Sequence, residues 1–254
     1  MFIEQKNIID SSERDNIAVV IPTFQRQTKL KRCLDSILKS TYKKLRVFVY
    51  CDNNDSESFE FVSKSYSDSL VHPILVNAHW YVIGCWNNFT RSSLLAESLL
   101  WNWDMMTWAV DDIEVNPDCL EKAVQAMKER YSDYDGVVGL SQICPGHPNY
   151  TYKPYGQVLL GKKFIKRYKE VDYQVCAPCF THFYQDEEMY TFAHSLGKFY
   201  HCQEAILKHY HPSFIREERD LTHEIVRGEI FQQDRKTFAE RTAKGLVWGK
   251  SWML

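Results

Sequence analysis

The sequence has no apolar run that approaches the ~20 residues needed to cross a membrane. Residues 1–16 are polar and charged and lack the apolar core of a secretory signal peptide. A charge imbalance is also absent, because 31 Lys and Arg nearly offset 33 Asp and Glu and leave a formal net charge of −2. The charge therefore gives no general case for nucleic acid or an anionic membrane as a partner. We expect a cytoplasmic protein without a membrane span.

The cysteines lack the paired spacing of a metal-binding or disulfide framework. Eight of them are scattered through apolar stretches, as is typical of reduced, buried thiols. Only Cys176 and Cys179 lie close together, and a structural zinc site would need a second such pair. We therefore interpret these two residues as ordinary core or loop cysteines.

Strand and helix patterns alternate over the first 140 residues. Strands are expected at 17–23, 45–51, 73–77, 105–110 and 136–140, and helices around 30–38, 59–67, 84–100 and 117–131. The segment at 17–23 is apolar throughout, which is typical of a strand that a parallel sheet buries on both faces. This alternation predicts an α/β fold with a Rossmann-like, mostly parallel sheet flanked by helices.

The second half of the sequence is less regular. We expect strands at 158–160, 199–202 and 205–208, helices at 162–168 and 186–196, and a mostly helical tail at 221–246. Because no linker is evident, we expect a single domain over 1–254. Its parts would be a nucleotide-binding half at 17–115, an acceptor and catalytic half at 116–220 and a C-terminal helical tail at 221–254.

Asp111 and Asp112 follow directly after the expected buried strand at 105–110. Two carboxylates at such a position repel each other and lose hydration, so the pair is unfavourable unless a cation compensates it. Carboxylate oxygens with few protein neighbours suit Mg²⁺ or Mn²⁺, which often completes its coordination with substrate phosphates. The alternative is an acidic turn that caps the following helix.

A second acidic segment, Asp52-Asn-Asn-Asp-Ser56, follows the strand at 45–51. In doubly wound folds, ligands bind beyond the carboxyl ends of the strands, which would bring Asp52 and the acidic pair into one cleft. Asp52 could accept hydrogen bonds from a base or a ribose. The alternative is an Asx-rich turn in which Ser56 caps the next helix.

Four motifs in this order resemble the family 2 type glycosyltransferases of the GT-A fold. They are Val19-Val-Ile-Pro-Thr-Phe-Gln-Arg26, Asp52-Asn-Asn-Asp-Ser56, Val110-Asp-Asp-Ile113 with Pro117 and Leu120, and Asp186-Glu-Glu188 with Leu196-Gly197. The resemblance covers about residues 17–211. It implies an inverting enzyme with a GT-A type fold that uses a nucleotide sugar and Mn²⁺ or Mg²⁺.

The resemblance also implies roles for residues that would bind the donor. Asp52 would contact the nucleoside, while Thr23 and Arg26, in the segment that begins at Pro22, would flank its base and phosphate. Asp111 would meet the ribose or the sugar.

The resemblance further implies a metal site at the acidic pair. Asp112 would contact the cation, although Ile113 stands where many relatives carry a third Asp. A histidine after the second-half strands often supplies another ligand in such enzymes. His209 and His211 both fall there, and we prefer His211.

Asp186 is similar in position, by its distance from Gly197, to the general base of the inverting members. Gln185 stands where many relatives have Glu, so Glu187 and Glu188 stay open as alternatives to Asp186. A carboxylate there could take the proton of an acceptor hydroxyl as it attacks the anomeric carbon. Alternatively, these acids only stabilise the start of a helix.

Together these features predict a metal-dependent, inverting glycosyltransferase of the hexosyl or N-acetylhexosaminyl type. We expect a uridine diphosphate sugar as donor and a hydroxyl on a glycan, a lipid-linked sugar, a protein or a modified nucleobase as acceptor, so nucleic acid would enter only as an acceptor. A nucleotidyltransferase is one alternative, but the segment Pro22-Thr-Phe-Gln-Arg26 has no glycine-rich phosphate loop. A non-catalytic nucleotide- or sugar-binding module is the other.

Overall fold

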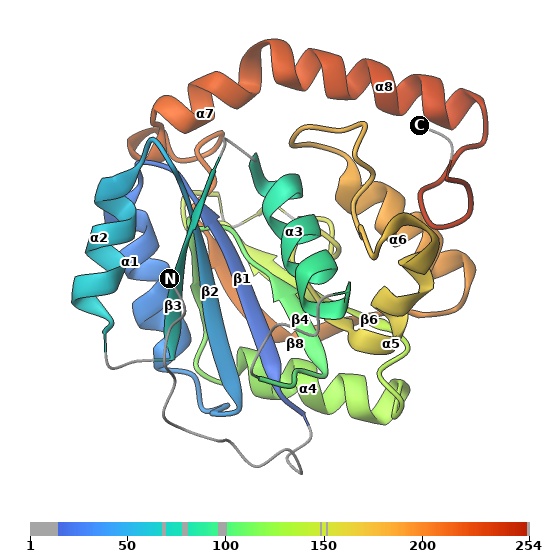
Figure 1. Ribbon diagram of the computed structural model, residues 1–254, viewed down its shortest axis with the longest axis horizontal. Coiled ribbons are helices and arrows are strands. Elements are labelled where there is room, and N and C mark those ends of the chain that lie inside the picture. Colours follow the sequence, from blue (N-terminus) through green and yellow to red (C-terminus); the bar gives the residue numbers. More distant parts are fainter. Residues whose placement is uncertain are drawn as a thin grey trace.

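The computed structural model describes residues 15–67, 70–77, 81–95, 101–147, 149–150 and 152–252. Within them, eight strands form one curved sheet with helices on both faces (Figure 1). The first part of the chain contains β1 Ile17–Thr23, α1 Gln27–Leu38, β2 Leu45–Asp52, α2 Ser56–Ser65, β3 Val71–Val76, α3 Tyr81–Leu95, β4 Met105–Trp108, β5 Ile113–Val115 and α4 Cys119–Arg130. The second part contains β6 Val137–Ile143, β7 Val158–Gly161, α5 Lys162–Ile165, α6 Gln185–Ser195, β8 Phe199–His209, α7 Leu221–Ile225 and α8 Phe231–Ala243.

The strands are arranged in the order β3-β2-β1-β4-β7-β6-β8-β5. The first four are parallel to one another, β7 runs antiparallel to β4 and β6, β8 is parallel to β6, and β5 is antiparallel to β8. The carboxyl ends of β1, β2 and β4 therefore meet at one edge of the sheet, which is where ligands bind in such folds.

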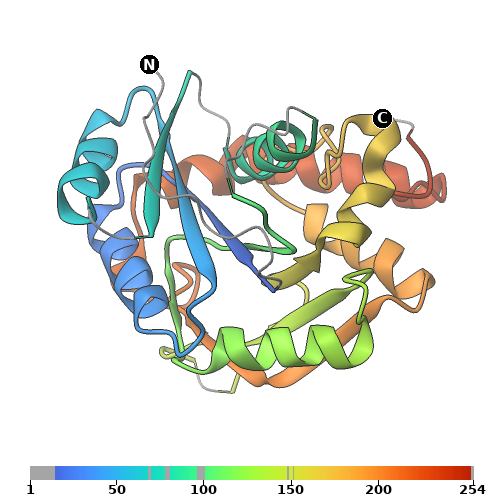
Figure 2. The ribbon, with the colours of Figure 1, turned by 60° about the horizontal axis from the view of Figure 1, so that its bottom comes forward.

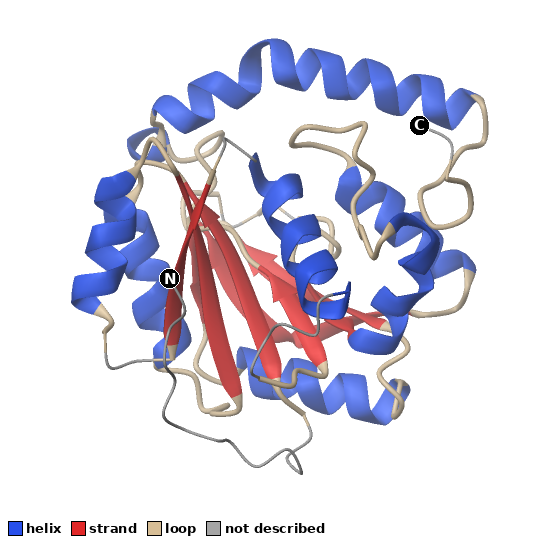
Figure 3. Cartoon of the chain, viewed as in Figure 1, coloured by secondary structure: helices blue, strands red, loops and turns tan. Residues whose placement is uncertain are grey.

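The alternation of side chains along β1 divides the core into two layers. Ile17, Val19 and Ile21 pack on the face covered by α1, α2 and α4. Ala18 and Val20 point to the opposite face, where the apolar side chains of α3, α5 and α6 gather (Figure 3). Because successive side chains of a strand point to opposite faces, an unbroken apolar strand is what a sheet covered on both sides requires.

The region around the acidic pair differs from the expectation. β4 ends at Trp108, although the Ala109 N–H still donates to the Val20 carbonyl (3.0 Å). Residues Ile113–Val115 form β5, a strand that we did not predict because three residues carry too little pattern. The helix expected from Pro117 begins at Cys119.

Other strand and helix boundaries also differ from those predicted. The two expected strands at 199–202 and 205–208 are one strand, β8, whose pairing with β6 shifts register between Leu140 and Ser141. The third helix begins at Tyr81 rather than near 84. The expected end of that helix at 96–100 and most of the polar leader, 1–14, lie outside the described residues.

The tail is helical as expected but is not one helix. A π-helical turn, Val226–Ile230, separates α7 from α8, and Gly228 leaves the helical region there (φ −78°, ψ −118°). The two helices lie across one end of the molecule, and α7 lies close to the carboxyl end of β1, where the Thr222 hydroxyl donates to the Phe24 carbonyl (Figures 1 and 2). Among the described residues, no helix is both long and apolar enough to span a membrane.

Candidate active site

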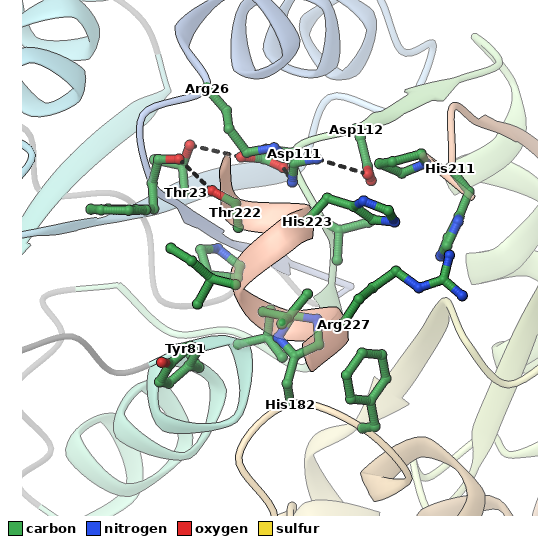
Figure 4. A pocket seen from close by; sticks show the side chains of 18 of the residues that line it. Thr23, Arg26, Tyr81, Asp111, Asp112, His182, His211, Thr222, His223 and Arg227 are labelled. Carbon is green, nitrogen blue, oxygen red and sulfur yellow. Dashed lines mark hydrogen bonds and ion pairs between the residues drawn. The ribbon is translucent and has the colours of Figure 1, made fainter. Parts of the chain in front are cut away.

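A cavity of about 360 Å³ opens at the carboxyl ends of β1, β2 and β4 (Figure 4). Its wall includes five residues that the sequence placed together, namely Pro22, Thr23, Asp52, Asp111 and Asp112. Arg26, His209 and His211 also line it. The tail closes the cavity on another side with Thr222, His223 and Arg227.

The guanidinium group of Arg26 lies between three carboxylates. Its Nη1 contacts Asp111 Oδ1 at 2.5 Å, its Nη2 contacts Asp112 Oδ2 at 3.2 Å, and its Nε contacts Asp220 Oδ2 at 2.8 Å. Lys29 binds the same Asp220 oxygen, and Thr23 donates from its hydroxyl to Asp111 Oδ2 (2.8 Å). The cluster thus joins the end of β1, the acidic pair and the start of α7.

The acidic pair is almost inaccessible to solvent, with Asp111 2% and Asp112 5% exposed. Burial raises the pKa of Asp111, and the neighbouring Asp112 charge adds to this against the opposing effect of Arg26. Burial also acts to raise the pKa of Asp112, but the positive charges of a protonated His209 and of Arg26 outweigh it and hold that pKa below its usual range. Asp112 is therefore the member of the pair that carries its negative charge most firmly.

His209 is brought to Asp112 by backbone pairing. Ile113 of β5 pairs with His209 of β8, and the Tyr210 N–H donates to the Asp112 carbonyl (2.9 Å). His209 Nε2 lies 3.3 Å from Asp112 Oδ1 as a result. On its other side, His209 Nδ1 lies 2.9 Å from Gln142 Oε1.

In a neutral His209 ring, the orientation of the Gln142 amide determines which ring nitrogen carries the proton. Gln142 Nε2 donates to the Lys153 carbonyl, which leaves Oε1 to accept the Nδ1 proton of His209. In that neutral form, the Nε2 lone pair faces Asp112 Oδ1, a buried oxygen that has no hydrogen-bond partner among the described residues.

A cation could bind between these two atoms, because their lone pairs face each other. Their 3.3 Å separation is close to the ~3 Å between neighbouring ligands of an octahedral ion with bonds of about 2.1 Å. A second hydrogen bond on the imidazole is also the usual support of a metal-binding histidine. Within the described ranges, no group of three His, Cys, Asp or Glu side chains could hold a metal ion, so a donor molecule would have to supply further ligands.

His211, the histidine that we preferred from the sequence, lies in the same wall but is held differently. Its Nδ1 accepts from the Ser213 N–H (3.1 Å), so a neutral ring carries its proton on Nε2. Burial and the nearby His209 lower the pKa of His211 to about 4, so the ring is neutral at pH 7. This geometry favours His209 over His211 as the histidine beside a cation, and the metal-binding role of His211 stays a prediction.

Residues 186–188, which include the predicted general base, lie beside the cavity and do not line it. A Cβ atom on Gly156 would lie 3.1 Å from Gln142 Nε2 and 3.9 Å from Asp186 Oδ2, so both side chains approach Gly156. Asp186 is partly buried, and burial with the charge of Glu187 raises its pKa to about 6.

The two alternatives to Asp186 differ from it in their contacts. Glu187 forms an ion pair with Lys153 (3.2 Å). Glu188 is buried, binds Arg241 through both oxygens (2.6 and 3.0 Å) and accepts from the Trp248 N–H (2.7 Å). Both oxygens of Glu188 are thus engaged in linking α6 to the tail.

A buried carboxylate of α8 holds the loop in front of α6. Asp234 is 0% exposed and accepts three backbone hydrogen bonds, from Thr181 (3.0 Å), His182 (2.8 Å) and Phe183 (2.8 Å). The side chains of His182 and Phe183 line the cavity. Asp234 therefore fixes a wall of the cavity and the entry to the helix that carries Asp186.

Sequence reasoning missed the contribution of the tail and of this loop. His223 and Arg227 lie in a charged segment that we described only as a helical tail, and Asp220, at the end of the predicted acceptor half, had no predicted role. The four-residue spacing of His223 and Arg227, which puts them on one helical face, was the only available signal. No sequence signal pointed to Gln142 or Asp234.

Comparison with known proteins identifies the family of the chain. The model of the family described as Glycosyl transferase family 2 matches residues 18–190, which is more than half of the chain. The chain belongs to glycosyl transferase family 2. No curated protein matches it.

Solved structures show which fold this family 2 chain has. S. aureus TarS 1-349 is similar at 12% identity with a TM-score of 0.57, and the match covers 78% of this chain and 61% of that one. The mannosyltransferase PcManGT from Pyrobaculum calidifontis, in complex with GDP-Man and Mn2+, is similar at 12% identity with a TM-score of 0.58, and the match covers 90% and 65%. TarS 1-349 in complex with UDP gives a TM-score of 0.56 at 11% identity, covering 76% and 60%.

These likenesses confirm the expected GT-A fold and the family resemblance. This chain matches less than two thirds of the length of each of those chains.

Replacing Arg26 by Ala should lower the free energy of unfolding of the ligand-free protein by roughly 3–5 kcal/mol, because it leaves two buried carboxylates without their cation. Chemical unfolding measures this change. The control is Lys31→Ala, which removes an exposed ion pair with Asp35 and should cost less than about 1 kcal/mol. A loss no larger for Arg26→Ala than for the control would contradict the compensating role of Arg26.

Replacing Asp234 by Ala should release the loop at 181–183, because three backbone donors lose a charged acceptor that is worth roughly 1.5–3 kcal/mol per bond. Hydrogen exchange of those three amides should become much faster. Glu240→Gln, on the same helix but in an exposed ion pair with Lys236, is the control. Unchanged protection of the three amides in Asp234→Ala would rule out this anchoring.

Proposed function

We propose that this family 2 protein is a metal-dependent, inverting glycosyltransferase that binds a nucleotide sugar in the cavity below α7. The observation that carries the proposal is the pairing of Asp112 Oδ1 with His209 Nε2 at 3.3 Å, beside a carboxylate pair that Arg26 already compensates. This arrangement offers a cation-binding site, here called the cation seat, formed by Asp112 and His209. It lies in a cavity at the carboxyl ends of parallel strands.

The nucleoside would lie at the end of the cavity formed by β1, β2 and α3. Asp52 is 5% exposed there and can accept hydrogen bonds from a base or a ribose. Tyr50 and Tyr81 also line this end, and aromatic rings can pack against a base. Pro22 and Thr23 close the wall, with Thr23 held by its bond to Asp111.

Asp112 and His209 would hold Mn²⁺ or Mg²⁺. Such an ion, when bound with a donor, neutralises the charge that develops on the departing diphosphate. Asp112 can serve both cations because Arg26 contacts Oδ2 while Oδ1 faces His209. Arg26 therefore keeps its place, and Asp111 remains paired with it beside the ribose or the sugar.

Asp186 would act as the base in the transfer step. As the acceptor oxygen forms its bond to the anomeric carbon, its proton moves to a carboxylate oxygen of Asp186. The bond between that carbon and the diphosphate oxygen breaks, and its electron pair leaves with the nucleoside diphosphate. Attack from the side opposite the leaving group inverts the anomeric centre without a covalent intermediate.

A uridine diphosphate sugar carrying a hexosyl or N-acetylhexosaminyl group is the donor to test first, since the similar TarS 1-349 structure contains UDP. GDP-mannose is the second, since PcManGT was solved with GDP-Man and Mn2+. The acceptor would be a hydroxyl of a glycan, lipid-linked sugar, protein or modified nucleobase. Residues 17–115 would bind the nucleotide of the donor and 116–220 the acceptor, within one domain, with His209 of the second part completing the cation seat.

Thermal unfolding with a panel of nucleotides tests the proposal without knowledge of the acceptor. UDP, GDP and their sugars are added with Mn²⁺, with Mg²⁺ or with a chelator. A ligand at 100 times its Kd stabilises the folded protein by about 2.7 kcal/mol, so a metal-dependent rise in Tm with one nucleotide is expected. A folded protein that responds to no nucleotide would favour the non-catalytic binding module instead.

Asp112→Ala should abolish Mn²⁺-dependent binding of the nucleotide, because it removes the charged oxygen at the cation seat. His209→Ala should weaken Mn²⁺ binding by roughly 10–100-fold, whereas His211→Ala should change it much less. Calorimetric titration with Mn²⁺ in the presence of the nucleotide measures all three variants. A larger loss of Mn²⁺ affinity in His211→Ala than in His209→Ala would instead identify His211 as the metal ligand.

Asp186→Asn should remove sugar transfer but leave nucleotide binding intact, because Asp186 lies outside the cavity lining. Since a base must be deprotonated and the pKa of Asp186 is raised to about 6, kcat should fall as the pH drops below about 6 and reach a plateau above it. Transfer that survives in Asp186→Asn but is lost in Glu187→Gln would move the base by one residue.

A further inference from the structure

His223 is a buried imidazole that faces the cavity, and neither ring nitrogen has a hydrogen-bond partner among the described residues, although Glu224 Oε1 lies 3.9 Å from Nδ1. Only 8% of the residue is exposed. A buried polar group left unpaired costs roughly 1–3 kcal/mol, so an unsatisfied imidazole in the wall of a cavity indicates a ligand that satisfies it. Burial, reinforced by the charge of Arg227, lowers the pKa of His223, so the ring is neutral and has one N–H to donate.

Arg227 lies four residues further along the tail and lines the same cavity. Its Nη1 donates to the Ser213 hydroxyl (2.9 Å), and no carboxylate among the described residues pairs with it. Arg26 and Arg241, in contrast, each bind carboxylates closely. In Figure 4, the side chains of His223 and Arg227 extend toward the side of the cavity where Asp112 and His211 lie.

Hydrogen bonds through Asp220 hold the tail in a fixed position relative to the acidic pair, and with it His223 and Arg227. The His223 N–H donates to Asp220 Oδ1 (2.9 Å), and Asp220 Oδ2 accepts from Arg26 Nε (2.8 Å). The other nitrogens of that guanidinium bind Asp111 and Asp112. Three bonded groups thus connect the backbone of His223 to the proposed cation seat.

The charges of the cavity leave an anion site on the tail. The positive charges of Arg26 and Lys29 are already matched by Asp111, Asp112 and Asp220. No described carboxylate pairs with the guanidinium of Arg227, and the imidazole of His223 lies near enough to feel its charge. A guanidinium with a neighbouring N–H donor is well suited to phosphate oxygens, because charge-assisted bonds to them are short and strong.

We propose that His223 and Arg227 form a phosphate-binding wall for the diphosphate of the donor and for the departing nucleoside diphosphate. This inference rests on the proposed function and assigns part of that site to the tail. The wall lies on the side of the cavity formed by the tail, so the diphosphate oxygens would lie between the cation and the two side chains. Donors already in place where charge develops stabilise the departing group without further rearrangement.

The experiment compares ligands that differ only in phosphate. Wild type, His223→Leu and Arg227→Gln are titrated calorimetrically with UDP, UMP and uridine in the presence of Mn²⁺, or with the guanosine series if GDP is the ligand. Both variants should lose roughly 10-fold or more in affinity for the diphosphate, while uridine affinity should stay within about twofold. Arg235→Gln, an arginine of α8 that does not line the cavity, is the matched control.

Arg227 is exposed, so Arg227→Gln should fold normally even if His223→Leu proves unstable. Diphosphate affinity within twofold of wild type in Arg227→Gln and in any folded His223 variant would overturn the phosphate-binding wall while leaving the proposed function standing. An equal loss for uridine would also overturn it, because the two side chains would then contact the nucleoside. A folded wild type that binds no nucleotide would remove both proposals.

Discussion

The guanidinium of Arg26 lies among three carboxylates, and the geometry of the cavity depends on its staying there. Asp111 and Asp112 come from the segment between β4 and β5, whereas Asp220 begins α7 more than 100 residues later. Buried carboxylates repel each other unless a cation compensates them. Because Arg26 contacts all three, the same interaction makes the acidic pair tolerable and fixes the tail across the end of β1.

The sheet then determines which atoms remain available to a ligand. Backbone pairing between β5 and β8 sets His209 opposite Asp112, and Gln142 of β6 holds the far side of the imidazole. Arg26 uses one oxygen of Asp112 and leaves the other facing the His209 lone pair. Three elements of the sheet therefore leave Asp112 Oδ1 and His209 Nε2 facing each other in a cavity that Asp52 also lines, and these are the atoms on which the proposed metal and nucleotide site depends.

The sequence predicted the features that depend on local pattern. The alternation of strands and helices and the gathering of Asp52 with Asp111 and Asp112 at one edge followed from apolar runs and strand ends, and the GT-A fold followed from the resemblance of four motifs to a known family. It could not decide between His209 and His211, because the choice depends on Gln142, a side chain 67 positions away. It also missed β5, Asp234 and His223, since a three-residue strand, a buried anchor and an unsatisfied imidazole are defined by tertiary contacts. The division into domains and the role of Asp186 stay predictions.

The central claim is that Asp112 and His209 form the cation seat of a nucleotide site. A crystal structure of the protein grown with UDP and Mn²⁺, or with GDP if the protein binds that nucleotide, tests it most directly, because anomalous scattering locates manganese. We predict a manganese peak within bonding distance, about 2.0–2.3 Å, of Asp112 Oδ1 and His209 Nε2, with diphosphate oxygens completing its coordination. A bound nucleotide whose diphosphate lies away from these atoms, with no manganese beside them, would contradict the claim.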